Sequence, residues 1–170
     1  ALTEIGAVYV ENGKINPDKS FCTFVNPGKP IPQKVVELTG INDSMVADAP
    51  TPAEAIRQFK EFCGDNILVA HNANSFDMLF IRKAGDKAGV DFSNTYIDTL
   101  PMAQALFPGL HNYKLDTINK HLEIQPFNRH RAVDDAMALA RIFEVMLSDL
   151  KEKDMTTVEA INTGLGGNKE

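Results

Sequence analysis

The chain has 170 residues, 44% of them hydrophobic, which is enough apolar material for one globular domain with a sizeable core. Its net charge of −6 argues against tight non-specific binding to duplex nucleic acid, which depends on neutralising phosphates. The apolar runs are too short to span a membrane and no signal-peptide pattern opens the chain, so we expect a cytoplasmic protein with no membrane partner. Cys22 and Cys63 lack paired metal-ligand spacing and are predicted to be small buried residues in a reducing compartment.

The chain is predicted to begin with a β-hairpin. Residues 2–10 read as a strand with apolar side chains on both faces, which is typical of a central strand. The turn signal Asn12-Gly13 joins this strand to a second one over residues 20–25. A helix is then predicted over residues 33–38, with Gly40 as its C-terminal stop.

The remainder of the chain alternates helices and strands. The segment 51–54 (TPAE) combines a capping box with proline at the first helical position and opens a helix that is predicted to end near Cys63. Further strands are predicted over residues 67–70 and 95–97, and further helices over residues 75–88, 99–107, 115–121 and 132–151. A hairpin followed by this alternation implies an α/β protein with a mixed sheet and helices on its faces.

Two aspartates stand at the beginning of the apolar faces of two predicted helices. Asp77 precedes Ile81 by four residues and Asp135 precedes Leu139 by four, so each is expected on the inward side of its helix, whereas Asp134 is expected to face water. A buried carboxylate needs a partner, and a bound cation is a natural one; ligation by oxygen alone suits Mg²⁺ or Mn²⁺. The alternative is that each aspartate only caps its helix, because acidic residues are common in first turns.

The segments that contain these aspartates resemble two motifs of the DEDDh 3′–5′ exonucleases. Residues 71–77 (HNANSFD) resemble the second motif, and residues 130–135 (HRAVDD) resemble the third, in which histidine stands five residues before aspartate. Connecting segments that are also typical of the family extend the resemblance over roughly residues 2–150: they are residues 36–41, 97–100 and 114–118. Within the family, the chain looks most like the proofreading domain embedded in the PolC-type bacterial DNA polymerase III α subunit.

The chain departs from this family in two places. The first motif, an Asp-x-Glu on the opening strand, is absent, and Glu4 is not a substitute because it matches a strand position of the family rather than its metal site. There is also one extra residue between His71 and Asp77, which makes the alignment of that loop uncertain by one residue. The resemblance implies a ribonuclease H-like fold in which the missing strand is central. A domain without that strand would expose a sheet edge, so we expect the natural chain to begin before Ala1.

The resemblance also implies a two-metal mechanism of phosphodiester hydrolysis. Such a site holds two divalent ions about 3.5–4 Å apart, which activate water and neutralise charge on the phosphate. By resemblance, Asp77 and Asp135 are metal ligands for Mg²⁺ or Mn²⁺. His130 matches the general base, and an unperturbed pKa near 6.5 suits it to accept a proton from water.

Other residues match family positions close to the substrate. The resemblance implies substrate-binding roles for Asn72, Phe76, Thr39, Gly40 and Ile41. For Phe76 a core position is an equal alternative, and for residues 39–41 the alternative is a helix C-cap followed by a core contact. His71 is interpreted as structural or peripheral, and Asp98 as a helix cap.

The sequence therefore predicts an exonuclease domain over residues 1–151 and a C-terminal extension or linker over residues 152–170. The predicted function is a metal-dependent exonuclease that removes nucleoside 5′-monophosphates from single-stranded DNA 3′ ends and proofreads for a DNA polymerase in the same chain or complex. One alternative is an RNA-trimming exonuclease or oligoribonuclease of the same superfamily. Another is a catalytically dead docking domain, which the absent first motif favours and the presence of Asp77, His130 and Asp135 opposes.

Overall fold

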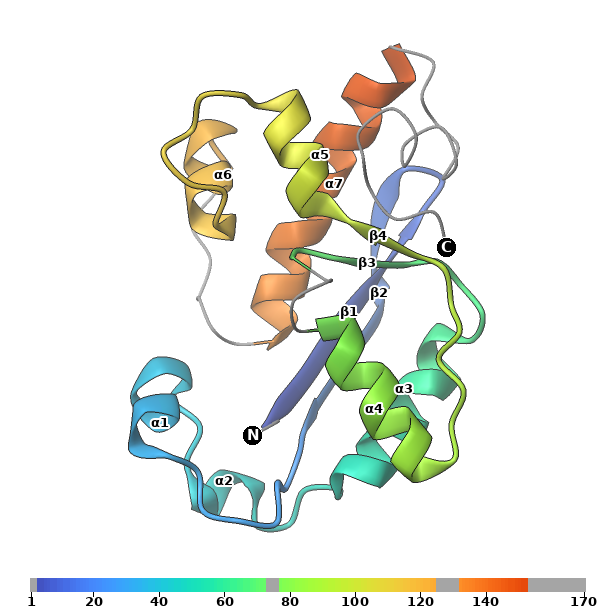
Figure 1. Ribbon diagram of the computed structural model, residues 1–170, viewed down its shortest axis with the longest axis vertical. Coiled ribbons are helices and arrows are strands. Elements are labelled where there is room, and N and C mark those ends of the chain that lie inside the picture. The colour runs from blue at the N-terminus through green and yellow to red at the C-terminus, as the bar shows by residue number, and fades with distance from the viewer. Residues whose placement is uncertain (1–2, 73–76, 125–131, 153–170) are drawn as a thin grey trace.

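The computed structural model of the protein describes residues 3–72, 77–124 and 132–152, and the side chains of these residues except 77–80, 151 and 152 (Figure 1). The elements follow the order β1-β2-α1-α2-α3-β3-α4-β4-α5-α6-α7. None of the helices in the described ranges is long and apolar enough to cross a bilayer.

The hairpin predicted from the sequence is present and is longer than expected. Strand β1 (Glu4–Glu11) pairs antiparallel with β2 (Lys14–Phe24), and Asn12 and Gly13 turn the chain with φ values of 53° and 78°, as a tight hairpin turn requires. The second strand was predicted to begin near Ser20 but begins at Lys14, although Pro17 cannot donate to a strand ladder. The register shifts between Val8 and Tyr9, so that Pro17 lies in the irregular part of the ladder.

Strand β3 (Leu68–Ala70) and strand β4 (Tyr96–Asp98) form a second, parallel pair. Within the described ranges, the strands thus form two separate pairs rather than one continuous mixed sheet. A cavity of about 950 Å³ is lined by residues of both β1 and β3.

The predicted helices are confirmed to within a few residues, and one short helix is new. The new helix is α2 (Asp43–Val46), for which Asn42 supplies the N-cap by accepting a hydrogen bond from the Met45 amide at 3.0 Å. The Thr51 capping box and the left-handed Gly40 stop are present as predicted. The other helices are α1 (Gln33–Thr39), α3 (Pro52–Cys63), α4 (Asp77–Ala88), α5 (Thr99–Leu106), α6 (Leu115–His121) and α7 (Ala132–Glu152).

Apolar side chains on both faces of the hairpin pack against helices, although within the described residues β1 pairs with β2 alone and is not the central strand that was predicted. On one face, Ile5 and Ala7 join a cluster built on the α3 residues Ile56 and Phe59. On the other face, α7 crosses β1 and buries Met146 in a second cluster together with α5 and α6 (Figure 1). The hairpin is therefore held between α3 and α7, and these helices fix its orientation.

The two cysteines differ in burial. Cys63 is buried beside Phe59, and this burial raises the pKa of its thiol. Cys22 is exposed, so the prediction that both cysteines are buried is wrong for Cys22. Because side chains alternate along a strand, Phe21 packs against the α3 cluster and Cys22 lies on the opposite face of β2.

Candidate active site

The candidate active site is the cavity between the two strand pairs. Its lining includes every residue of β1, the end of β3 at Ala70 and His71, the α4 residue Ile81 and the α7 residue Asp135. Segments far apart in the sequence thus border one space. The cavity runs along the whole of β3, from Asp65 to His71, and so includes the carboxyl end of that strand, the position where open α/β sheets bind ligands.

A close approach between β1 and α7 fixes one wall of the cavity. A Cβ atom at Gly6 would lie 2.4 Å from the Ala132 carbonyl carbon and from the Val133 nitrogen, so only glycine fits there. Glu4 Oε1 accepts a hydrogen bond of 2.9 Å from the Ala132 amide, which is one of the free donors at the helix start. The negative charge of Glu4 also suits the positive end of the helix dipole. Glu4 therefore anchors the start of α7 to β1.

Asp135 lies in the first turn of this anchored helix. Its side chain is half-buried and lines the cavity, as its position four residues before Leu139 predicted. Asp134 is also half-buried rather than fully solvated, but it does not line the cavity. Adjacent carboxylates on one helix thus have different surroundings, and only Asp135 is placed to bind a ligand in the cavity.

A hydrogen-bond network joins the carboxyl ends of β3 and β4. Asp98 Oδ1 accepts hydrogen bonds from the Leu100 amide and from the Asn72 amide, each at 2.9 Å. His71 Nδ1 lies 2.8 Å from Thr99 Oγ1, and His71 Nε2 contacts the Tyr113 carbonyl oxygen. Burial lowers the pKa of His71 below its usual value, against opposing effects of the Tyr113 carbonyl and the Asp98 carboxylate.

This network was not anticipated from the sequence. Asp98 is the helix cap that was predicted, but it also binds the Asn72 amide, and His71 is a central member rather than a peripheral residue. One signal was available: polar pairs follow two predicted strands, at His71-Asn72 and Asp98-Thr99. In a parallel pair the carboxyl ends of both strands lie at the same edge. Parallel pairing of these two strands therefore brings the four residues together.

The predicted substrate-binding residues of α1 have structural contacts. Gly40 has φ 75° and ends the helix, while Thr39 Oγ1 donates to the Val35 carbonyl at 2.8 Å and accepts from the Ile41 amide at 3.1 Å. Ile41 is 1% exposed and packs in a small core. These contacts fit the alternative of a helix C-cap followed by a core contact. The substrate role of residues 39–41 stays a prediction.

Several predicted site residues cannot be placed. Phe76, His130 and the side chain of Asp77 lie outside the described residues, although Asp77 is the first residue of α4. Asn72 is described; it is exposed and has φ 59°. Among the described side chains, no three histidine, cysteine or acidic residues form a metal-binding group. The predicted metal site therefore stays a prediction that depends partly on residues outside the described ranges.

Comparisons with known proteins identify relatives of the whole domain. The profile of the family described as Exonuclease (RNase_T) matches residues 1–143. The PolC-type DNA polymerase III of Caldanaerobacter subterraneus subsp. tengcongensis is 46% identical over 164 residues, which are 96% of this chain and 12% of that protein. The corresponding protein of Bacillus subtilis strain 168 is 41% identical over 97% of this chain and 11% of its own length. The chain thus spans about an eighth of the length of these relatives.

Solved structures with a similar fold are also exonucleases. Exonuclease X, in complex with 5′-overhanging duplex DNA, has a TM-score of 0.69 at 25% identity and covers 86% of this chain and 82% of its own. The nuclease domain of 3′hExo, a DEDDh family member bound to rAMP, has a TM-score of 0.70 at 18% identity, with coverages of 86% and 80%. The resemblance predicted from the sequence and the predicted ribonuclease H-like fold are therefore confirmed.

Proposed function

Because the chain belongs to the exonuclease family, we propose that it is a metal-dependent 3′–5′ exonuclease domain that removes nucleoside 5′-monophosphates from DNA 3′ ends and proofreads for a PolC-type DNA polymerase. The observation that carries the proposal is the position of Asp135. This aspartate of the third family motif lines the cavity that follows β3 to its carboxyl end, and it stands on a helix that Glu4 and Gly6 anchor to β1.

The residues of this chain suit divalent cations such as Mg²⁺ or Mn²⁺. Asp135 offers carboxylate oxygens to the cavity, and Ile81, one helical turn after Asp77, lines the same cavity. We therefore assign metal binding to Asp77 and Asp135. Bound divalent ions supply neutralisation of the phosphate charge and a more acidic water. His130 would accept the proton from that water, and the neutral imidazole suits this task near pH 7.

Asn72, Phe76 and residues 39–41 are proposed to contact the terminal nucleotides. The partners we propose are a single-stranded DNA 3′ end and a polymerase in the same chain or complex, because the relatives at 46% and 41% identity are DNA polymerases. A tethered domain receives its substrate at a high effective concentration, so a net charge of −6 is compatible with activity. We further propose a domain over residues 1–151, a linker over residues 152–170 and a cytoplasmic location.

Trimming of RNA is the second candidate function. It is favoured by one observation, the similarity in fold to an exonuclease domain bound to rAMP. The much higher identity to DNA polymerases favours DNA. Matched single-stranded DNA and RNA oligonucleotides with labelled 5′ ends separate the candidates, since faster shortening of RNA would overturn the proofreading role.

The decisive experiment compares two adjacent aspartates in the full-length polypeptide that carries this sequence. Asp135→Asn should lower exonuclease turnover by at least about 100-fold, because it removes a charged metal ligand, and it should abolish stabilisation by millimolar Mn²⁺ in thermal melts. Asp134→Asn is the matched control and should retain both properties, because Asp134 does not line the cavity. Equal activity of the two variants would refute the proposed site.

A second variant separates proton transfer from metal binding. His130→Ala should keep the stabilisation by Mn²⁺ but lose most hydrolysis, because general-base catalysis contributes roughly 10²–10⁴-fold. Turnover of His130→Ala equal to that of the unmodified protein would remove His130 as the base, whatever the result at Asp135.

A further inference from the structure

We propose that His71, together with Asp98 and Thr99, is a positioning residue of the active site, which fixes the turn at Asn72 from which the chain continues to Asp77. The inference rests on the proposed function, because it assigns these side chains a role in a reaction for which Asp77 is a metal ligand. It concerns residues that were interpreted from the sequence as structural, peripheral or capping.

The contacts of His71 fix the tautomer of its neutral ring. The Tyr113 carbonyl oxygen can only accept, so His71 Nε2 carries the proton and donates to it. In the neutral ring Nδ1 then accepts from Thr99 Oγ1 at 2.8 Å, a shorter contact than the 3.4 Å from the same hydroxyl to the Ala70 carbonyl oxygen. The imidazole thus bridges the end of β3, the start of α5 and the loop before α6, with both ring nitrogens in use. A side chain bound on both sides cannot serve as the general base and is suited to hold the backbone that carries it.

The Asp98 carboxylate holds the next residue of the same turn. Asp98 is 3% exposed, and its Oδ1 binds the amides of both Leu100 and Asn72 at 2.9 Å. Asn72 has φ 59°, in the left-handed region that asparagine adopts more readily than most residues but less readily than glycine. A residue persists in that region only when its surroundings hold it there. The hydrogen bond to Asp98 does so.

The network extends the strand pairing into the site. Ala70 and Asp98 are the last partners of the parallel ladder, and His71 and Thr99 follow them directly. Their side-chain contact continues the pairing by one residue after both strands have ended. His71 also lines the cavity that Asp135 lines. The turn at Asn72 is thereby fixed relative to α5 at the edge of the candidate active site.

This arrangement predicts an effect on catalysis beyond any loss of stability. A displacement of about 1 Å in an active site can lower the rate by about 100-fold. His71→Leu in the full-length polypeptide should therefore lower kcat for single-stranded DNA by about 100-fold, with a change in KM of less than about 3-fold. His71→Gln keeps a donor for the Tyr113 carbonyl. Its kcat should therefore be at least about a tenth of that of the unmodified protein.

A second variant tests the same contact with a smaller change, so that a loss of activity is less easily caused by misfolding. Thr99→Val preserves the volume of a fully buried side chain and removes the hydroxyl that binds His71 at 2.8 Å and contacts the Ala70 carbonyl at 3.4 Å. It should lower kcat by about 10-fold. Thr23→Val is the matched control, because it removes a β2 hydroxyl that donates to the Phe24 carbonyl at 2.9 Å on the other strand pair, and its kcat should equal that of the unmodified protein. Amide hydrogen exchange at Asn72 should accelerate at least about 10-fold in both His71→Leu and Thr99→Val.

The outcomes separate this inference from the proposed function. If Thr99→Val and His71→Leu keep kcat within about 2-fold of the unmodified protein while Asp135→Asn is inactive, the positioning role is overturned and the exonuclease assignment stands. If the unmodified protein shortens neither DNA nor RNA, the proposed function itself fails. Loss of kcat with faster exchange at Asn72, rescued in part by His71→Gln, supports the inference.

Discussion

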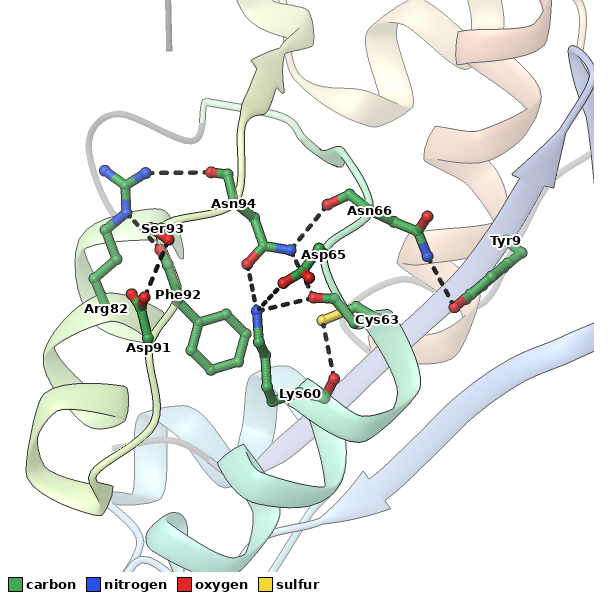
Figure 2. A network of polar contacts seen from close by, with 11 residues as sticks. Tyr9, Lys60, Cys63, Asp65, Asn66, Arg82, Asp91, Phe92, Ser93 and Asn94 are labelled. Carbon is green, nitrogen blue, oxygen red and sulfur yellow. Dashed lines mark hydrogen bonds and ion pairs between the residues drawn. The ribbon is translucent and has the colours of Figure 1, made fainter.

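The two ends of the β3–β4 pair carry polar networks that look alike and differ in what they contact. At the amino end, Lys60 Nζ donates to Asn94 Oδ1 at 2.8 Å and to the Gly64 carbonyl at 2.9 Å, while Asn94 Nδ2 donates to the carbonyls of Gly64 and Asn66 at 2.9 Å (Figure 2). Tyr9 extends this network to β1, since its hydroxyl accepts from Asn66 Nδ2 at 3.1 Å and donates to the Phe62 carbonyl. At the carboxyl end, the network of His71 and Asp98 holds a turn that enters a segment with family motifs.

This difference shows that a polar network by itself does not indicate a functional site. The amino-end network joins α3 to the chain before β4, and its polar atoms bind backbone carbonyls and amide side chains that need partners in any case. Both networks reach the cavity that Asp135 lines, the amino-end network through Tyr9 and Asn66 and the carboxyl-end network through His71. The position of a network relative to the strand direction distinguishes the two roles, because ligands bind at the carboxyl ends of parallel strands.

The largest change in stability is expected at Asp98. Asp98→Ala removes the acceptor of two amides in a buried position and should lower the free energy of unfolding by about 3 kcal/mol, measured by urea denaturation. Exonuclease turnover below the unfolding transition should fall as well. Asp98→Asn keeps a side-chain oxygen in place and is the control with a smaller loss in both quantities. Equal turnover of Asp98→Ala and the unmodified protein would contradict the conclusion that the carboxyl end of the β3–β4 pair serves the reaction and the amino end does not.

A smaller effect, on stability alone, is expected at the amino end. Lys60→Met leaves Asn94 Oδ1 without its charged donor and should lower the free energy of unfolding by about 2 kcal/mol. Its kcat should be unchanged below the unfolding transition, because this network lies away from the carboxyl end of β3. Lys87→Met, at an exposed position of α4, is the matched control and should change neither quantity. A reduced kcat for Lys60→Met alone would show that both ends serve the reaction.

The smallest effect is a pH dependence of stability that comes from His71. Its folded pKa lies below the unfolded value near 6.5, because burial disfavours the charged ring. Between these two pKa values the unfolded chain binds more protons, so stability rises with pH through this window and is fully present above it. The difference in unfolding free energy between the unmodified protein and His71→Gln, measured by urea titration from pH 5 to pH 8, should show this loss on acidification. A difference that does not vary with pH would contradict a buried neutral His71.

Local signals in the sequence were sufficient for most of the helices. The capping box at Thr51, the left-handed stop at Gly40 and the hairpin turn at Asn12-Gly13 act through neighbouring backbone groups, so their sequence alone predicts their structure. The inward position of Asp135 followed from the helical period in the same way. Short α2 and the irregular part of β2 were missed, because a four-residue helix has no period and Pro17 argues against a strand.

What the sequence determined by itself is the set of capped helices, the apolar faces and the family motifs around Asp77 and Asp135, all of which depend on residues close together in the chain. Only the tertiary structure decided that β3 and β4 end side by side, so that His71 meets Thr99 and Asp98 meets the Asn72 amide. The tertiary structure also decided that α7 packs against Gly6. All of these contacts join segments far apart in the sequence, and no periodic pattern of residues predicts such contacts. Pairing between distant segments is set by the packing of the whole core, and it is this packing that gives Asp98 and His71 their roles.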